Sequence, residues 1–580
     1  MIPVDRQLAN SDIFKVCKVC EEKPVNHKPV NHKPVNPSAL PMDIKRLLLT
    51  ILTVLCVSIT GLSLVSSLNE TQIQSRLELY QTNLLLRVVG LDSDRPVPPE
   101  IMDVSIDSIG QAVRAGFGQS SAFEQALNAY QTFRKSAQAT VDTFSDRLDN
   151  PDNTITAEEL FTLQTEIQQQ TQVIAEVDIR IGLLLAAEGD RDRAQNQWNS
   201  LVPDRFTLKN ALTQPATDPL DRVGQTAGIA SVLWRDDTGD VLTQTLGRNA
   251  ETVPPQLQEL DGWFEDVAIA RWFTLTDQTD ALATLKASAN TQANRTALKL
   301  STVNLIPIIG LLIGTGLLIF LMIQRLVQKS QAILALNSTE SWSVPWSSET
   351  ILQVFVVGFF FVGQLITPVI ISATTGAAGI NRATLTGLPK ASLILLGYGL
   401  LSIPGLWVLR YSIREYWPLA KPWFDYSFRD RWFRWGIGGY GVALPLVVGI
   451  SLVNQYLWQG RGGSNPILGI ILENRDPWAI AAFFLTASIA APLFEETLFR
   501  GFLLPSLTRY LSPWGAVVVS ALEFAIAHLS LSEVLPLPVL GIVLGGVYLR
   551  TRTLVVPILL HGLWNSGTLI SLLVLSNGGI

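Results

Sequence analysis

Residues 479–500 read AIAAFFLTASIAAPLFEETLFR, an apolar stretch that carries no charge before Glu495. A membrane-spanning helix needs about 20 predominantly apolar residues, so the sequence predicts a span over 479–499 with its charges at the cytoplasmic end. At about 100° per residue, Glu496 and Arg500 lie one turn apart on one helix face and are expected to form an ion pair. Glu495 then faces another direction, where it is available to hold water. A charge cluster at the end of a helix, without any chemistry, is the alternative interpretation.

Eight more apolar segments are spread along the 580 residues. Only 16% of the residues are charged and 48% are hydrophobic, whereas soluble domains carry about a quarter of charged residues. The additional segments predicted to cross the membrane are 47–68, 301–324, 350–374, 389–409, 435–458, 513–530, 534–549 and 553–575. We therefore expect an all-α fold, a polytopic transmembrane helical bundle of about nine spans, with one inserted and mostly helical extramembrane domain.

These patterns divide the chain into five parts. We expect a low-complexity tail at 1–41, an N-terminal membrane anchor helix at 42–68, an acidic extracytoplasmic helical domain at 69–300, transmembrane helices with a basic cytoplasmic loop at 301–460, and at 461–580 the transmembrane core that carries the candidate site. The tail contains the repeat Lys-Pro-Val-Asn-His, which does not pack a core. Met42 opens a signal-anchor pattern and is an alternative start of the protein.

Four residues of the tail have a spacing similar to that of zinc ligands: Cys17, Cys20, His27 and His32. Both histidines belong to the repeat, however, so the repeat by itself accounts for their spacing.

The segment 70–299 contains 33 acidic and 19 basic residues and no apolar run long enough to span a bilayer. It is therefore predicted to be an acidic domain outside the membrane. Its best-defined pattern is Gly182, a Gly189-Asp turn, then an alanine and Trp198 at packing positions, which is similar to the helix–turn–helix of a tetratricopeptide repeat. A weaker copy runs over 268–287. We expect this domain to bind a protein partner.

Basic residues at the ends of the apolar segments set the expected orientation, because short cytoplasmic loops are rich in lysine and arginine. Lys45 and Arg46 place the N-terminus in the cytoplasm, so the acidic domain is translocated. The other basic residues assigned to the cytoplasmic side are Arg325, Lys329, Arg410, Arg414, Lys421, Arg429, Arg431, Arg434, Arg500, Arg509, Arg550 and Arg552. We expect an integral, multi-pass protein of a bacterial plasma membrane or another internal membrane.

Two further motifs place polar side chains in apolar segments, where ionisable groups are costly and suggest function. Phe524-Ala-Ile-Ala-His528 puts an aromatic ring and an imidazole on one helix face, and His561-Gly-Leu-Trp-Asn565 does the same for an imidazole and a carboxamide. Taken alone, each motif is equally compatible with helix packing or interhelical hydrogen bonds.

Together the three motifs supply the groups needed to hydrolyse an amide inside a membrane. Glu495 can deprotonate a water held with His528, while His561 and Asn565 can donate to the developing oxyanion. Glu523 is a further carboxylate in an apolar segment, and the sequence assigns it no role.

In this order along the chain, Glu-Glu-x-x-x-Arg, Phe-x-x-x-His and His-x-x-x-Asn resemble the motifs of the CAAX-protease and bacteriocin-processing (CPBP, or ABI) family, whose relatives include the type II CAAX prenyl endopeptidases. The resemblance covers about residues 470–575 and implies an intramembrane endopeptidase. It implies that Glu495, His528, His561 and Asn565 are catalytic and that Glu496, Arg500 and Phe524 support them. The family is often called a metalloprotease family. A mechanism without metal and a Zn²⁺ ion held by Glu495, His528 and His561 both fit these residues.

The expected partners are a peptide or protein substrate, which can be membrane-associated, and the lipid bilayer; no nucleic acid is expected. A non-catalytic receptor or assembly scaffold that presents the helical domain is the alternative function. A transporter with a Glu–His proton relay is disfavoured, because the sequence shows neither an inverted repeat nor a pair of broken helices.

Overall fold

The computed structural model describes residues 44–68, 73–91, 119–149, 157–214, 216–235, 252–335, 342–382, 385–419, 423–428, 431–458, 462–463, 468, 470–471 and 476–576. These residues form helices and no strands, so the predicted all-α class is confirmed. The tail, with its candidate zinc ligands and the repeat, lies outside the described residues.

Seven helices in the described ranges are long and apolar enough to cross a membrane. They are Ile44–Ser67 (α1), Thr279–Gln331 (α12 and η2), Ser348–Ala377 (α13, η3 and α14), Gly387–Ser412 (α15), Trp432–Trp458 (α16), Pro477–Leu507 (α18 to α20) and Val555–Val574 (within α23). The two other predicted spans are the shorter apolar helices α21 (Pro513–Ile526) and α22 (Pro536–Thr551), of 14 and 16 residues. All nine predicted segments are therefore helical, but two of them fall short of the usual spanning length.

The helix that carries the two adjacent glutamates runs to Leu507, beyond the predicted end at residue 499. Arg500 therefore lies inside this helix and is fully buried, so its assignment to a cytoplasmic loop was wrong. The sequence pattern favours a helix end at the charged group, because an isolated arginine is costly in a membrane. Here the arginine is neutralised by a buried carboxylate, which removes the reason to end the helix.

The acidic domain contains the predicted helix–turn–helix, formed by α5 (Ala157–Glu188) and α6 (Arg191–Asn199). Gly189 has a φ of +92° in the turn, and the Asp190 side chain caps α6 by accepting from the Arg193 N–H at 3.2 Å. Trp198 is fully buried against Gly182, where any side chain would collide with the indole ring. The glycine and the tryptophan are thus complementary. Membership of the tetratricopeptide class stays a prediction.

The remaining helices of this domain are α2 (Ile73–Val89), α4 (Gln119–Asp149), α7 (Leu208–Thr213), α8 (Pro219–Leu233), α10 (Pro255–Gln258) and α11 (Trp263–Leu275). They enclose one apolar core around Trp198, Trp263 and Trp272. The following helix α12 (Thr279–Gln328) passes through the expected domain boundary at residue 300 without a break. The acidic domain and the first span after it therefore share one helix.

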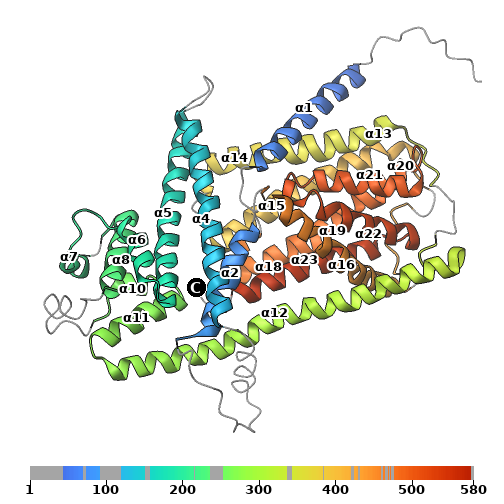
Figure 1. Ribbon diagram of the computed structural model, residues 1–580. Helices are drawn as coiled ribbons and strands as arrows, with labels where there is room; N and C mark the ends of the chain where they lie inside the picture. The colour runs from blue at the N-terminus through green and yellow to red at the C-terminus, as the bar shows by residue number, and fades with distance from the viewer. Residues whose placement is uncertain are drawn as a thin grey trace, which may run out of the picture. The chain divides into compact units, whose positions relative to one another are not determined.

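Short 3-10 turns complete the described elements: η2 (Lys329–Gln331), η5 (Arg414–Tyr416) and η8 (Leu531–Glu533). The helices α16, α19, α22 and α23 lie side by side in the C-terminal bundle (Figure 1).

Asp476 fixes two of the neighbouring helices at their starts. One carboxylate oxygen caps α18 (Pro477–Leu485) through the Trp478 N–H at 2.9 Å, and the other accepts from the Leu388 N–H of α15 at 2.9 Å.

Candidate active site

The two glutamates lie on a short α-helical turn between two π-helical stretches. The turn is α19 (Ala491–Glu496); η6 (Thr486–Ala490) precedes it and η7 (Thr497–Leu503) follows it, before α20 (Leu504–Leu507) closes the helix. Pro492 has no N–H and cannot donate to the preceding turn, which favours a local departure from α geometry. Wide turns of this kind are frequent at functional sites, because they redirect side chains without ending the helix.

Glu496 and Arg500 form the predicted ion pair, with 2.9 Å between Glu496 Oε1 and Arg500 Nη1. Both side chains are essentially inaccessible to solvent. The guanidinium group also donates from Nη2 to the Gly541 carbonyl at 3.2 Å, and its central carbon lies 4.6 Å from the centre of the Phe524 ring. The charge of the arginine is thus balanced by one carboxylate and covered by an aromatic face.

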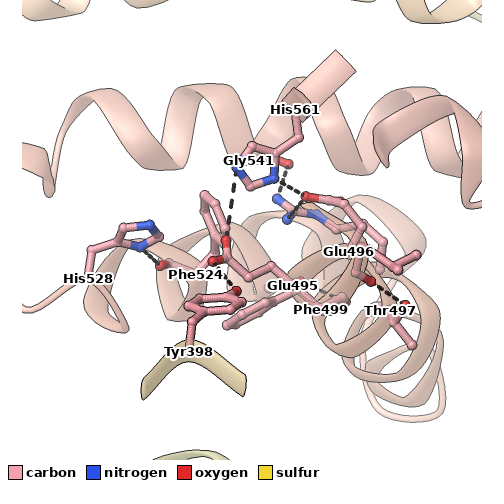
Figure 2. Close-up of polar contacts among 12 residues, drawn as sticks. Tyr398, Glu495, Glu496, Thr497, Phe499, Phe524, His528, Gly541 and His561 are labelled. Carbon is pink, nitrogen blue, oxygen red and sulfur yellow. Dashed lines mark hydrogen bonds and ion pairs between the residues drawn. The ribbon is translucent and has the colours of Figure 1, made fainter. Parts of the chain in front are cut away.

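His561 contacts both glutamates, one through each ring nitrogen (Figure 2). Its Nδ1 lies 2.9 Å from Glu496 Oε1, and its Nε2 lies 4.0 Å from Glu495 Oε2. Because Glu496 is paired with an arginine and accepts hydrogen bonds, Nδ1 carries a hydrogen and donates it. This leaves Nε2 of the neutral ring as the proton-accepting nitrogen, directed toward Glu495.

Glu495 is held by a residue from outside the three motifs. The hydroxyl of Tyr398, on α15, donates to Glu495 Oε1 at 3.1 Å. The other oxygen, Oε2, is buried and has no hydrogen-bond partner among the described residues. The adjacent glutamates thus have different partners, Arg500 for Glu496 and Tyr398 for Glu495, while the catalytic role of Glu495 stays a prediction.

Phe524 lies against both imidazoles and joins the second motif to the third. The centre of its ring is 4.9 Å from that of His528 and 5.7 Å from that of His561. His528 Nδ1 lies 2.8 Å from the Phe524 carbonyl oxygen, which can only accept, so this nitrogen carries the hydrogen and Nε2 is free of it in the neutral ring. Within the described part of the chain, His528 makes no hydrogen bond or ion pair with Glu495.

Asn565 is directed at the backbone of the glutamate helix. Its Nδ2 donates to the Ala487 carbonyl of η6 at 2.7 Å. This carbonyl lies one turn before Pro492, which supplies no N–H, and a carbonyl left without a donor is costly in a membrane. One of the two amide hydrogens of Asn565 is therefore used structurally, and the second is available to another acceptor.

The close approach of α23 (Val555–Ser576) to the glutamate helix depends on Gly562, the residue after His561. A Cβ atom at Gly562 would lie 2.7 Å from the Ser488 carbonyl oxygen, which is backbone and cannot move aside. Glycine at this position lets the two helices come near enough for His561 to reach both carboxylates.

Replacing Gly562 with alanine is expected to force these helices apart, with a loss of about 1–3 kcal/mol in the free energy of unfolding, as for other overpacked sites. Gly438→Ala on α16 (Trp432–Trp458), where nothing lies within 4 Å, is the matched control and should leave stability nearly unchanged. Detergent-induced or thermal unfolding of the two purified variants measures the difference. Equal stability would contradict the proposed tight contact.

A zinc ion bound by the predicted ligand set does not fit this arrangement. The described residues contain no group of three or more His, Cys, Asp or Glu side chains placed to hold a metal ion. In these residues His528, the third expected ligand, makes no hydrogen bond or ion pair with Glu495, so the three side chains are not gathered around one point.

Tyr398 is the site residue that the sequence analysis missed. It lies within the predicted span 389–409, where the sequence pattern shows only an apolar segment. A single tyrosine in such a segment is common, and its hydrogen-bond partner, Glu495, is 97 residues away in the chain. Glu523 on α21 makes no hydrogen bond or ion pair with the site in the described residues, in agreement with its exclusion.

Fold and site together define a polytopic, all-α integral membrane protein with a buried glutamate–histidine cluster. Comparison with known families agrees with this class of protein: residues 477–567 match the family model described as "Type II CAAX prenyl endopeptidase Rce1-like". The predicted resemblance to the CPBP, or CAAX protease, family is confirmed for this segment. All residues of the three motifs lie within the match, whereas Tyr398 and the acidic domain lie outside it.

Among curated proteins, the chain is similar to "Putative membrane peptidase YdiL" of Bacillus subtilis (strain 168), with 28% identity over 132 residues. These residues are 23% of this chain and 53% of the relative, so the chain spans about half the length of the curated relative that it matches. No solved structure matches the chain.

Proposed function

We propose that this protein is a CAAX protease-like membrane endopeptidase that hydrolyses a peptide bond with a water activated by Glu495. One observation supports this proposal above the others. Glu495 Oε2 has no partner in the described structure and lies 4.0 Å from His561 Nε2. A water molecule can accommodate this spacing by donating one hydrogen to each atom.

In the proposed reaction, Glu495 takes a proton from this water as the oxygen attacks the carbonyl carbon of the substrate. The electron pair of the C=O bond moves to its oxygen, and in this proposal the remaining N–H of Asn565 donates to the negative charge there. When the C–N bond breaks, the nitrogen takes the proton from Glu495 and leaves as an amine. The water thus ends as the hydroxyl of the new acid and one hydrogen of the new amine.

The two histidines then have roles that differ from those given by the motifs alone. His561, held through Nδ1 by Glu496, orients the water from the side opposite Glu495. His528 packs against the same Phe524 ring as His561 and keeps its Nε2 free to contact the substrate. To donate a hydrogen bond to the oxyanion, this Nε2 must carry a hydrogen. The sequence-based hypothesis placed the water between Glu495 and His528, whereas the contacts favour His561.

The substrate we propose is a peptide segment of a membrane-associated protein that reaches the site from the cytoplasmic face or through the lipid. The side chain of Glu495 is 15% exposed, although its Oε2 is itself buried, so part of this residue is within reach from outside the bundle. The acidic domain would lie on the opposite side of the membrane, by the distribution of basic residues, and the membrane would be a bacterial plasma membrane.

The test is a comparison of protein N-termini in the membranes of cells that produce either the natural chain or the Glu495→Gln form. New N-termini that occur only with the natural chain support the proposal and identify the substrates. If the two cell types yield the same N-termini while the variant still supports every phenotype of the natural chain, a scaffold function replaces the enzymatic one.

A further prediction concerns the hydroxyl of Tyr398, which we propose to be a positioning group for Glu495. Tyr398→Phe removes one hydrogen bond to a carboxylate and should lower kcat about tenfold with little change in KM. Tyr456→Phe, at a side chain of α16 that is 80% exposed, is the control and should behave as the natural chain does. A rise in KM with unchanged kcat would instead assign Tyr398 to substrate binding.

A further inference from the structure

The acidic domain contains a half-open cavity of about 280 Å³, far along the chain from the three motifs. Helices α5, α8 and α10 wall it, and its charged and amide side chains are Gln172, Glu176, Arg180, Arg222, Gln256, Glu259 and Asp261. The volume is at the small end of the range for ligand sites, enough for a short stretch of peptide but not for a folded element.

Gln256 lines this cavity and carries an unsatisfied acceptor. Its side chain is fully buried, and its Nε2 donates to the Ala211 carbonyl at 2.7 Å and to Gln225 Oε1 at 3.2 Å. Since the Ala211 carbonyl can only accept, these contacts fix which end of the amide is nitrogen. The remaining oxygen, Oε1, is buried and has no partner in the described residues. An unsatisfied buried oxygen costs free energy that a ligand N–H would recover.

Arg222 gives the same cavity an unsatisfied donor. Its Nη1 contacts Glu259 Oε1 at 3.4 Å, while its Nε is buried without a partner in the described structure. The other arginine, Arg180, has similarly long contacts with Asp261 at 3.5 Å and with Glu176 at 3.8 Å. The ion pairs therefore neutralise both arginines but leave one N–H directed at no acceptor.

The chemistry of this lining excludes two classes of ligand. Three carboxylates against two arginines repel a phosphate or another strong anion, and a lining of charged groups does not suit a lipid chain. A peptide bond, in contrast, presents an N–H and a C=O close together and without charge, which matches the unsatisfied oxygen of Gln256 and the unsatisfied N–H of Arg222. The excess carboxylate favours a segment with one basic side chain.

We propose that this cavity binds an extended peptide segment that carries a lysine or arginine, with a backbone N–H on Gln256 Oε1 and a backbone C=O on Arg222 Nε. The peptide can belong to a substrate or to a separate regulatory partner, and both present the same chemistry. The site does not depend on the hydrolytic function proposed above, because none of its residues touches the glutamate–histidine cluster.

The test uses the full-length Glu495→Gln protein in detergent micelles, so that a bound peptide is not consumed. The probes are two fluorescent libraries of capped pentapeptides, one with lysine and one with glutamate fixed at the centre, and binding is followed by fluorescence anisotropy. The lysine library should bind at least about tenfold more tightly, as one added charge contact predicts. Equal binding of the two libraries, or none at millimolar concentration, overturns the proposal.

Two variants connect the binding to the cavity. Arg222→Lys keeps the charge beside Glu259 but removes the Nε hydrogen, and should weaken the lysine library about tenfold. Arg193→Lys, at an exposed ion pair with Asp190 in the same domain, is the matched control and should not change binding. If both variants bind as the unmodified chain does, the peptide lies elsewhere. Peptide binding by the natural chain without cleavage would support this proposal and assign the peptide to a regulatory partner, whereas cleavage of the bound peptide would assign it to a substrate.

Discussion

Glutamine at position 495 is expected to lower the rate of peptide cleavage by about 10²- to 10⁴-fold, the usual contribution of a general base. Glutamine has nearly the size and shape of glutamate, and its carbonyl oxygen can still accept from the Tyr398 hydroxyl. What it lacks is the proton-accepting oxygen that lies 4.0 Å from His561 Nε2. The measurement is kcat/KM of the purified full-length variant on a peptide that the natural chain cleaves.

Glu523→Gln provides the matched control for this experiment. It removes a carboxylate from an apolar helix one residue before Phe524, at a side chain that makes no described contact with Glu495 or either histidine. Activity within a factor of about two of the natural chain is expected. Should Glu495→Gln also keep more than about a tenth of the natural activity, Glu495 would not be the base.

Local helical geometry accounts for the part of this site that could be predicted. Glu496 and Arg500 are four residues apart within one continuous helix, and helix periodicity alone brings such side chains together. Their contact, at 2.9 Å between charged atoms, follows from the spacing. The same reasoning correctly separated Glu495 from its neighbour, because adjacent residues on a helix point in different directions.

Helix periodicity could not predict the contacts between helices. The sequence indicated that His561 points into the bundle, but not that it would meet two carboxylates from another helix. That result requires the close approach at Gly562, and a glycine next to a histidine does not by itself indicate a close contact between helices. Tyr398 was missed for the same reason, since its partner Glu495 is distant in the chain. The helix end was misplaced at residue 499 because the burial of Arg500 depends on other helices, through the Gly541 carbonyl and the Phe524 ring.

In the C-terminal helices, the apolar sequence pattern predicts membrane spans, whereas the lengths of two helices fall short of a full span. The segments that became α21 and α22 are apolar enough to be recognised, yet they have 14 and 16 residues. The second motif lies at the end of the first of these helices, since α21 stops at Ile526 and His528 follows it. The motif therefore combines a helix end with a turn, where the Nδ1 hydrogen of His528 satisfies a backbone carbonyl that the helix leaves unpaired.

Replacing Glu496 with glutamine is expected to destabilise the protein as well as inactivate it. In the folded protein, Oε1 of Glu496 accepts from both Arg500 and His561, and an amide oxygen could keep both hydrogen bonds. The loss is one of charge: Arg500 would stay fully buried with no anion beside it. Breaking a buried pair in this way typically costs about 3–5 kcal/mol of unfolding free energy, whereas Arg193→Gln at an exposed ion pair should cost less than about 1 kcal/mol.

A double variant separates the two effects of this change. Adding Arg500→Met to Glu496→Gln removes the unpaired charge and should restore most of the lost stability, because a buried ion pair can be replaced by apolar groups at little cost. Activity should stay low, since His561 still lacks the carboxylate that accepts its Nδ1 hydrogen and fixes the ring that orients the water. Unfolding in detergent and peptide cleavage, measured on the same preparations, provide the two readouts. Recovery of both stability and activity would show that Glu496 serves only to neutralise Arg500, and the reaction would then need no carboxylate behind His561.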